Sequence, residues 1–189
     1  MGDIEDPVPL LFTSGSPSLL AQYVPDRLMT NKDEEGSPIM FGDLGSSVTH
    51  HFAPFSVVYG DAARLKLQSY VVVQRGAIVR PPLRPLVNQL VAQSVASVDI
   101  GYFTIIGEKT VCEAAEVGNF VRIDAQCVIG SRVRIPDGVW IRPRSWIPPD
   151  AVLAPYTVYE GSPAMSLGRI DYDAYRLGQM EFIRECVDW

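Results

Sequence analysis

Residues 117–159 read VGNFVRIDAQCVIGSRVRIPDGVWIRPRSWIPPDAVLAPYTVY, and a six-residue period runs through the whole stretch. A large apolar residue recurs at every sixth position, and a small or medium-sized residue follows four places after it. The first set is Val117, Ile123, Ile129, Ile135, Ile141, Ile147, Leu153 and Tyr159, and the second is Val121, Cys127, Val133, Val139, Ser145, Ala151 and Thr157. Neither an α-helix nor a simple alternating strand produces this period. The stretch therefore predicts a parallel β-helix built from hexapeptide repeats.

The period also predicts where each residue lies in such a fold. One hexapeptide forms one short strand and one turn, and three of them close a triangular coil of about 18 residues. Coils stack at roughly the 4.8 Å spacing of neighbouring strands, with backbone hydrogen bonds along the axis. The large aliphatic residue then fills the interior, and the small residue fits the crowded corner. Known hexapeptide folds have a left-handed crossover, an exception to the right-handed rule, and we expect the same hand here.

The period continues upstream with two interruptions. Two further runs are in register, Leu67, Val73 and Val79, and then Ile100, Ile106 and Cys112. The step from Cys112 to Val117 is five residues, which predicts a one-residue deletion at a corner. The step from Val79 to Ile100 is 21 residues rather than 18, which predicts a loop insertion whose first part is stiffened by prolines.

We predict an all-β fold, a left-handed parallel β-helix, in three parts. An irregular N-terminal arm covers residues 1–56, the β-helix covers 57–163 with a loop insertion at about 81–99, and a C-terminal α-helix occupies 164–189. Asp171 is a suitable N-cap for this helix. Its apolar stripe contains Tyr172, Tyr175, Gln179, Phe182, Ile183 and Cys186, and we expect the stripe to pack on one wall of the β-helix or on a partner.

The composition is typical of a soluble globular domain and excludes several other classes. The 189 residues are 47% hydrophobic, with 16 Lys and Arg against 22 Asp and Glu, so the formal net charge is −6. No run of 18 apolar residues is present, so we expect no membrane insertion. The acidic balance speaks against nucleic acid as a partner. Three cysteines without a CxxC spacing speak against a disulfide framework or a structural zinc site and favour a reducing, cytosolic protein.

Residues 60–80, GDAARLKLQSYVVVQRGAIVR, follow the opening pattern of the γ-class carbonic anhydrases, and the chain resembles that family. The resemblance implies zinc bound by three histidines at subunit interfaces. At the corresponding positions this chain has Arg80, Glu108 and Glu113, and an arginine stays protonated and cannot bind zinc. The only histidines, His50 and His51, are adjacent and lie outside the predicted coils. One chain therefore cannot supply the ligand set.

The sequence also lacks the residues that other catalytic reactions of this fold would need. Glu108 and Glu113 are either a carboxylate pair for a hard cation or proton transfer, or corner acids answered by Arg80. An acyltransferase of this fold needs a catalytic histidine in a coil or loop, and residues 52–189 contain none. No P-loop or GxGxxG is present, and the two cysteines at inward repeat positions are expected to be protonated and inert. We predict that the protein is not an enzyme and has no cofactor and no bound metal.

The segments between the hexapeptides resemble the dynactin subunit 5 family, whose members are small β-helix proteins of the γ-carbonic-anhydrase-like hexapeptide-repeat superfamily. The resembling segments are AIVRPP (77–82), DIGYFTIIGEKTVCEAAEVG (99–118), CVIGSRVRI (127–135) and PPDAVLAPYTVYEGSPA (148–164). The match covers roughly residues 60–160, and the first 50 residues depart from the family pattern.

This resemblance implies a non-enzymatic structural or adaptor subunit of the dynactin pointed-end complex, located in the cytoplasm on the cytoskeleton. The implied partners are a sister β-helix subunit (dynactin subunit 6-like), the large zinc-bearing subunit, the pointed-end actin-related protein, and dynein adaptors or cargo. The alternative is a divergent γ-carbonic-anhydrase-like protein, inactive or an assembly factor, that forms a homotrimer. A stable homotrimer would favour this alternative, and an obligate heteropair would favour dynactin.

Two walls of the predicted prism carry candidate interface residues. The sixth position of each hexapeptide faces outward, and residues one coil apart stack on the same wall. This stacking joins Val111, Val128 and Trp146 on one wall, and Arg122, Trp140 and Val158 on another. A monomer rarely leaves such an apolar stripe uncovered, and Trp and Arg are enriched in binding hot spots. If the C-terminal helix covers only one wall through Phe182 and Ile183, we expect the other to be the subunit interface.

Overall fold

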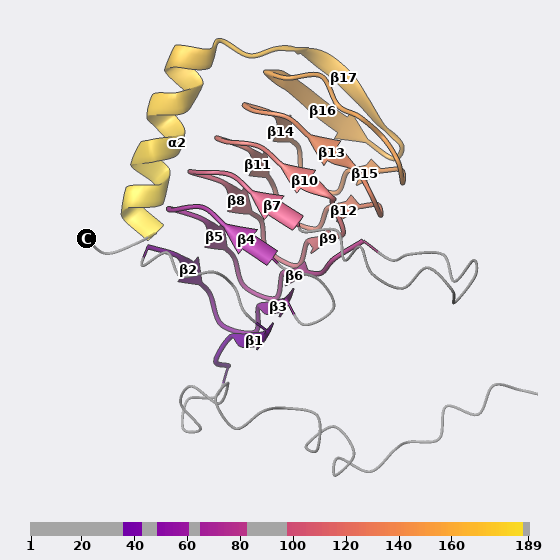
Figure 1. Ribbon diagram of the computed structural model, residues 1–189. Helices are drawn as coiled ribbons and strands as arrows, with labels where there is room; N and C mark the ends of the chain where they lie inside the picture. The colour runs from indigo at the N-terminus through magenta and orange to yellow at the C-terminus, as the bar shows by residue number, and fades with distance from the viewer. Residues whose placement is uncertain (1–35, 43–48, 61–64, 83–97, 187–189) are drawn as a thin grey trace, which may run out of the picture. The chain divides into compact units, whose positions relative to one another are not determined.

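Short strands stack into three sheets that form the three walls of a solenoid (Figure 1). Sheet A contains β1 (Ile39–Gly42), β3 (Val57–Gly60), β6 (Ile78–Val79), β9 (Val111–Cys112), β12 (Val128–Ile129) and β15 (Trp146–Ile147). Sheet B contains β2 (His51–Phe52), β5 (Val72–Val73), β8 (Ile105–Ile106), β11 (Arg122–Ile123), β14 (Trp140–Ile141), β16 (Thr157–Gly161) and β17 (Ala164–Arg169). Sheet C contains β4 (Leu65–Leu67), β7 (Val98–Ile100), β10 (Glu116–Val117) and β13 (Arg134–Ile135).

The computed structural model describes residues 36–42, 49–60, 65–82 and 98–186. From β4 to β15 the chain visits sheets C, B and A in turn, and each strand pairs in parallel with the strand one coil away. The predicted parallel β-helix is therefore confirmed. Val128 pairs with Trp146 across a full coil and with Val111 across a coil one residue shorter, in agreement with the predicted deletion. Most of the predicted arm and of the predicted loop insertion, residues 1–35 and 83–97, lies outside the described residues.

The interior of the prism is filled by the predicted repeat residues. The large set, from Val117 to Tyr159, is buried at every position, and the upstream runs from Leu67 and Ile100 are buried as well. Side chains stack from coil to coil, as Ile123, Ile141 and Tyr159 do in sheet B. Each fully buried aliphatic side chain contributes about 1.5–3 kcal/mol through removal of apolar surface from water. This repeated stacking holds the short strands together.

An aromatic ladder marks the corner between sheets C and B. The rings of Tyr70 and Phe103 stack with centroids 4.7 Å apart, and those of Phe103 and Phe120 with centroids 5.1 Å apart. Each of these residues has a positive φ, the left-handed conformation that closes the turn. One coil further on the position is Gly138, where an added Cβ would lie 2.3 Å from the ring of Tyr156. Gly138, which has no Cβ, leaves space for the ring of Tyr156 at this corner.

Both ends of the solenoid extend beyond the predicted repeat. Strands β1 and β2 precede residue 57 and already pair with β3 and β5: an 18-residue step brings Ile39 opposite Val57, and a 21-residue step brings His51 opposite Val72. At the other end, β17 pairs antiparallel with β16 before the helix begins. Helix α2 therefore spans Tyr172–Cys186 rather than starting directly after residue 163. Within the described residues no helix is long and apolar enough to cross a membrane.

Candidate protein-interaction face

Sheet C is a charged wall. Its outward residues Lys66, Asp99, Glu116 and Arg134 are all exposed, and they lie in register from strand to strand. The Lys66 Nζ and an Asp99 carboxylate oxygen are 3.8 Å apart. Such exposed pairs contribute little to stability because water and salt screen them. This wall is suited to contact with solvent.

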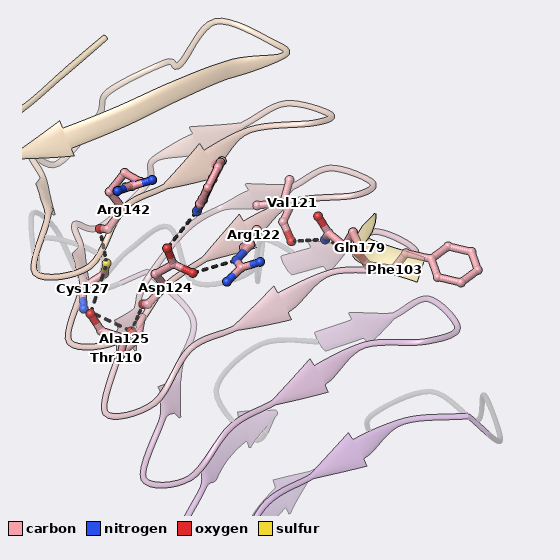
Figure 2. Close-up of polar contacts among 10 residues, drawn as sticks. Phe103, Thr110, Val121, Arg122, Asp124, Ala125, Cys127, Arg142 and Gln179 are labelled. Atoms are coloured by element: carbon pink, nitrogen blue, oxygen red, sulfur yellow. Dashed lines mark hydrogen bonds and ion pairs between the residues drawn. The ribbon is translucent and has the colours of Figure 1, made fainter. Parts of the chain in front are cut away.

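Sheet B is covered by α2, which runs from the β17 end of the solenoid back toward β2 (Figure 1). Ile183 is fully buried and packs on the outward side chains of Val72 and Ile105. Gln179 is also buried, and its Nε2 donates hydrogen bonds to the carbonyl oxygens of Phe103, at 2.6 Å, and Val121, at 2.9 Å (Figure 2). The helix therefore docks through an apolar contact and a specific polar one. Asp171 lies at its start as predicted, and its Oδ1 accepts a hydrogen bond from the Asp173 backbone amide at 3.2 Å.

The predicted cluster of Arg122, Trp140 and Val158 lies on this same wall. The Trp140 Nε1 donates to Asp124 Oδ2 at 2.8 Å, and the Arg122 Nε donates to Asp124 Oδ1 at 2.7 Å. The ring of Tyr175 on α2 lies 6.2 Å from that of Trp140. Burial raises the pKa of the Tyr175 hydroxyl, so this phenol stays neutral. The Trp140 cluster holds the N-terminal half of the helix.

Sheet A presents an apolar ladder along its full length. Its outward residues are Ile39, Val57, Ile78, Val111, Val128 and Trp146, and each pairs in register with the next. Val128 and Trp146 expose 46% and 39% of their surface, and Ile39 exposes 50%. The described helix lies on sheet B, so in the described part of the chain sheet A has no helical cover. An apolar stripe of this length is characteristic of an interaction site.

Reasoning from the sequence identified only the second half of this ladder. Val111, Val128 and Trp146 lie in the unbroken repeat, so counting back by one coil reaches them. The three earlier members, Ile39, Val57 and Ile78, were missed because the steps from Val57 to Ile78 and from Ile78 to Val111 are 21 and 33 residues rather than 18 and interrupt the count. Ile78 had a signal, since it directly precedes the inward residue Val79 as Trp146 precedes Ile147.

A second outward row runs beside the ladder, where sheet A turns toward sheet C. At its start the rings of Phe41 and Tyr59 stack with centroids 5.0 Å apart. Further along, the Arg80 guanidinium forms an ion pair with the Glu113 carboxylate. Glu108 lies in a different turn, between β8 and β9, so the structure does not bring the two glutamates together as a carboxylate pair. The interpretation of Glu113 as a corner acid answered by Arg80 matches this geometry.

The side chains in the described residues that could carry chemistry include acids, cysteines and histidines. No group of three or more His, Cys, Asp or Glu residues in this part of the chain is arranged to hold a metal ion. Burial raises the pKa of both Cys112 and Cys127 to about 11, so these thiols stay protonated at neutral pH. Partial burial lowers the pKa of His50, while its neighbour His51 lies in β2 at the edge of a shallow groove that Glu108 also lines.

We expect the purified protein to contain no stoichiometric zinc and to hydrate no carbon dioxide. The reason is chemical: zinc needs neutral imidazole, thiolate or carboxylate ligands, and Arg80 places a permanent cation at the first of the three positions. Metal analysis of the purified chain tests this expectation. A content of about one zinc per chain would contradict it.

Solved structures with a similar fold are hexapeptide-repeat proteins. A hexapeptide transferase family protein from Anaplasma phagocytophilum has a TM-score of 0.65 and 14% sequence identity, covering 78% of this chain and 82% of its own. A Bacillus cereus protein provisionally assigned as an acetyltransferase has a TM-score of 0.53 and 13% identity, covering 80% of this chain and 91% of its own. At these identities the likeness shows the fold alone. The class is therefore a hexapeptide-repeat β-helix protein.

The family follows from the sequence itself. Residues 51–177 match the model of the dynactin subunit 5 family, and the chain belongs to that family. The matched segment runs from β2 into α2 and so includes strands of all three sheets. No curated protein matches the chain. Membership of the family supports a role as a dynactin subunit.

Proposed function

We propose that this protein is a non-enzymatic structural subunit of the dynactin pointed-end complex and that sheet A is its interface with a second, dynactin subunit 6-like β-helix protein. The observation that carries the proposal is the in-register apolar ladder from Ile39 to Trp146. Of the three walls, sheet C is charged and sheet B is covered by α2, which leaves sheet A for a partner.

The geometry of sheet A suits a flat protein partner. In-register strands give a wall of regularly spaced side chains, and another β-helix wall has the same spacing of about 4.8 Å. Trp146 ends the ladder with a large, partly exposed aromatic ring, the kind of residue that most often dominates interface energetics. Covering the ladder removes apolar surface from water at roughly 25 cal/mol per Å² before the costs of association.

The remaining partners of the proposal come from the family. A dynactin subunit 5 protein would attach, with its sister subunit, to the large zinc-bearing subunit and the pointed-end actin-related protein. From there it would support the engagement of dynein adaptors or cargo, in the cytoplasm on the cytoskeleton. The corner ion pair of Arg80 and Glu113 and the inert Cys112 and Cys127 support a non-enzymatic role.

Co-expression with a second hexapeptide protein tests the proposal. We expect the chain expressed alone to form no defined complex with copies of itself. Expressed with the dynactin subunit 6-like protein, it should purify as a one-to-one heteropair, because the partner then covers sheet A. Light scattering coupled to gel filtration gives the mass of each species. A stable homotrimer that does not bind the co-expressed protein would instead support the γ-carbonic-anhydrase-like alternative.

A further inference from the structure

The ion pair of Arg80 and Glu113 lies at the edge of the proposed interface. Arg80 directly follows β6 and Glu113 directly follows β9, so both lie at the edge of sheet A, where the wall turns toward sheet C. Ile78 and Val111 pair directly across β6 and β9. The ion pair therefore joins the two central strands of sheet A at the edge of the wall, beside the apolar ladder.

Among the described residues, the hydrogen-bonding groups of the pair are incompletely satisfied. The Arg80 Nε donates to Glu113 Oε1 at 2.7 Å, and Nη2 donates to the same oxygen. Within the described residues, Glu113 Oε2 and Arg80 Nη1 have no hydrogen-bond partner. The Glu113 side chain is only 12% exposed, whereas that of Arg80 is 44% exposed. Among the described residues, the Glu113 Oε2 acceptor and the Nη1 N–H donors of Arg80 are thus left for groups outside the pair.

We infer that the Arg80–Glu113 pair is a specificity determinant that sets the register of the partner on sheet A. A partner that covers the ladder also removes this pair from water, and each charged atom left without a hydrogen bond then costs free energy. A fitting partner therefore places an acceptor, such as a carboxylate or carbonyl oxygen, opposite Arg80 Nη1. It places a hydroxyl or amide donor opposite Glu113 Oε2. A partner shifted by one coil would press apolar groups onto the pair and bind weakly.

This inference rests on the proposed use of sheet A and adds the chemistry that the partner must present there. The five aliphatic members of the ladder do not select a register among themselves, because each offers a similar branched side chain at a similar spacing. A single polar pair within an apolar interface selects one register, as a buried polar residue does in a coiled coil. The pair is already formed in the free chain, so little side-chain entropy is lost when the partner arrives.

The test measures the dissociation constant for the co-expressed dynactin subunit 6-like protein with three variants. Arg80→Lys keeps the charge but loses the forked donors, and Arg80→Met removes the charge and leaves the Glu113 carboxylate alone. Glu113→Gln removes the opposite charge. The control is Lys66→Met, which breaks the matching ion pair with Asp99 on sheet C. Thermal melting of each free variant verifies that the fold is retained.

We expect Arg80→Met and Glu113→Gln to weaken binding about tenfold or more, Arg80→Lys by less, and Lys66→Met not at all. The double variant Arg80→Met/Glu113→Gln should recover part of the loss, because no unpaired charge is then buried. If Trp146→Glu abolishes binding while the Arg80 and Glu113 variants bind normally, this inference is overturned and the proposed interface stands. If Trp146→Glu also binds normally, sheet A is not the interface and both proposals fall.

Discussion

Ile141→Ala is expected to destabilise the protein by roughly 2–5 kcal/mol. Ile141 is fully buried, and its side chain lies between Ile123 in the coil below and Tyr159 in the coil above. Truncation leaves a cavity inside a prism whose walls are short strands fixed by their neighbours, so little relaxation can fill it. For a domain of this size the loss lowers the melting temperature by about 2–4 °C per kcal/mol.

A neighbouring pair of residues supplies the matched control. Ile129 and Val128 are consecutive in β12, but Ile129 is fully buried and Val128 is 46% exposed. Ile129→Ala should be as damaging as Ile141→Ala, whereas Val128→Ala should change the melting temperature of the free chain very little. A melting temperature unaffected by both isoleucine truncations would show that the assigned register is wrong.

Trp146→Glu is expected to weaken pairing with the second β-helix subunit by about 100-fold or more, because it removes a hot-spot ring and buries an unpaired charge. Trp146 is partly exposed in the free chain, so the variant should fold and melt almost normally. Titration of labelled partner measures the change.

Two other substitutions that change charge distinguish the roles of sheets B and C from that of sheet A. Lys66→Glu reverses a charge on sheet C and should leave pairing intact. Trp140→Glu should act differently, since Trp140 lies against Tyr175 and bonds to Asp124 under α2. We expect it to loosen the helix and lower the melting temperature. If Trp146→Glu pairs normally with the second β-helix subunit, sheet A is not the interface.

The inward half of the fold could be predicted from the sequence because the prism interior imposes one strict demand. Every sixth residue must fill the same narrow space, so the period from Val117 to Tyr159 assigns each strand and each buried side chain. The deletion after Cys112 was visible for the same reason, since a coil shortened by one residue shifts every later member of the series. A packing requirement that repeats every six residues can therefore be recognised in the sequence.

The choice of wall for α2 could not be predicted in the same way. Both sheet A and sheet B present apolar outward residues, and an amphipathic helix fits either. The choice depends on contacts between distant segments, such as the bonds from Gln179 to the carbonyl oxygens of Phe103 and Val121. Every residue has a backbone carbonyl group, so the side-chain pattern of the sequence cannot show which carbonyl groups accept these hydrogen bonds. The N-terminal strands were hidden for a different reason: β2 pairs with β5 across 21 residues rather than 18, so counting back by one coil from Val72 does not reach His51.

The role as a dynactin subunit that pairs through sheet A is tested by a pull-down of the tagged chain from cells, followed by mass spectrometry, with the unaltered protein and the Trp146→Glu variant side by side. We expect the unaltered chain to bring down the second β-helix subunit, the large zinc-bearing subunit and the actin-related proteins of dynactin. We expect Trp146→Glu, although folded, to lose the second β-helix subunit. Recovery of the unaltered chain without any dynactin subunit, or equal recovery of the second β-helix subunit by both proteins, would contradict this role.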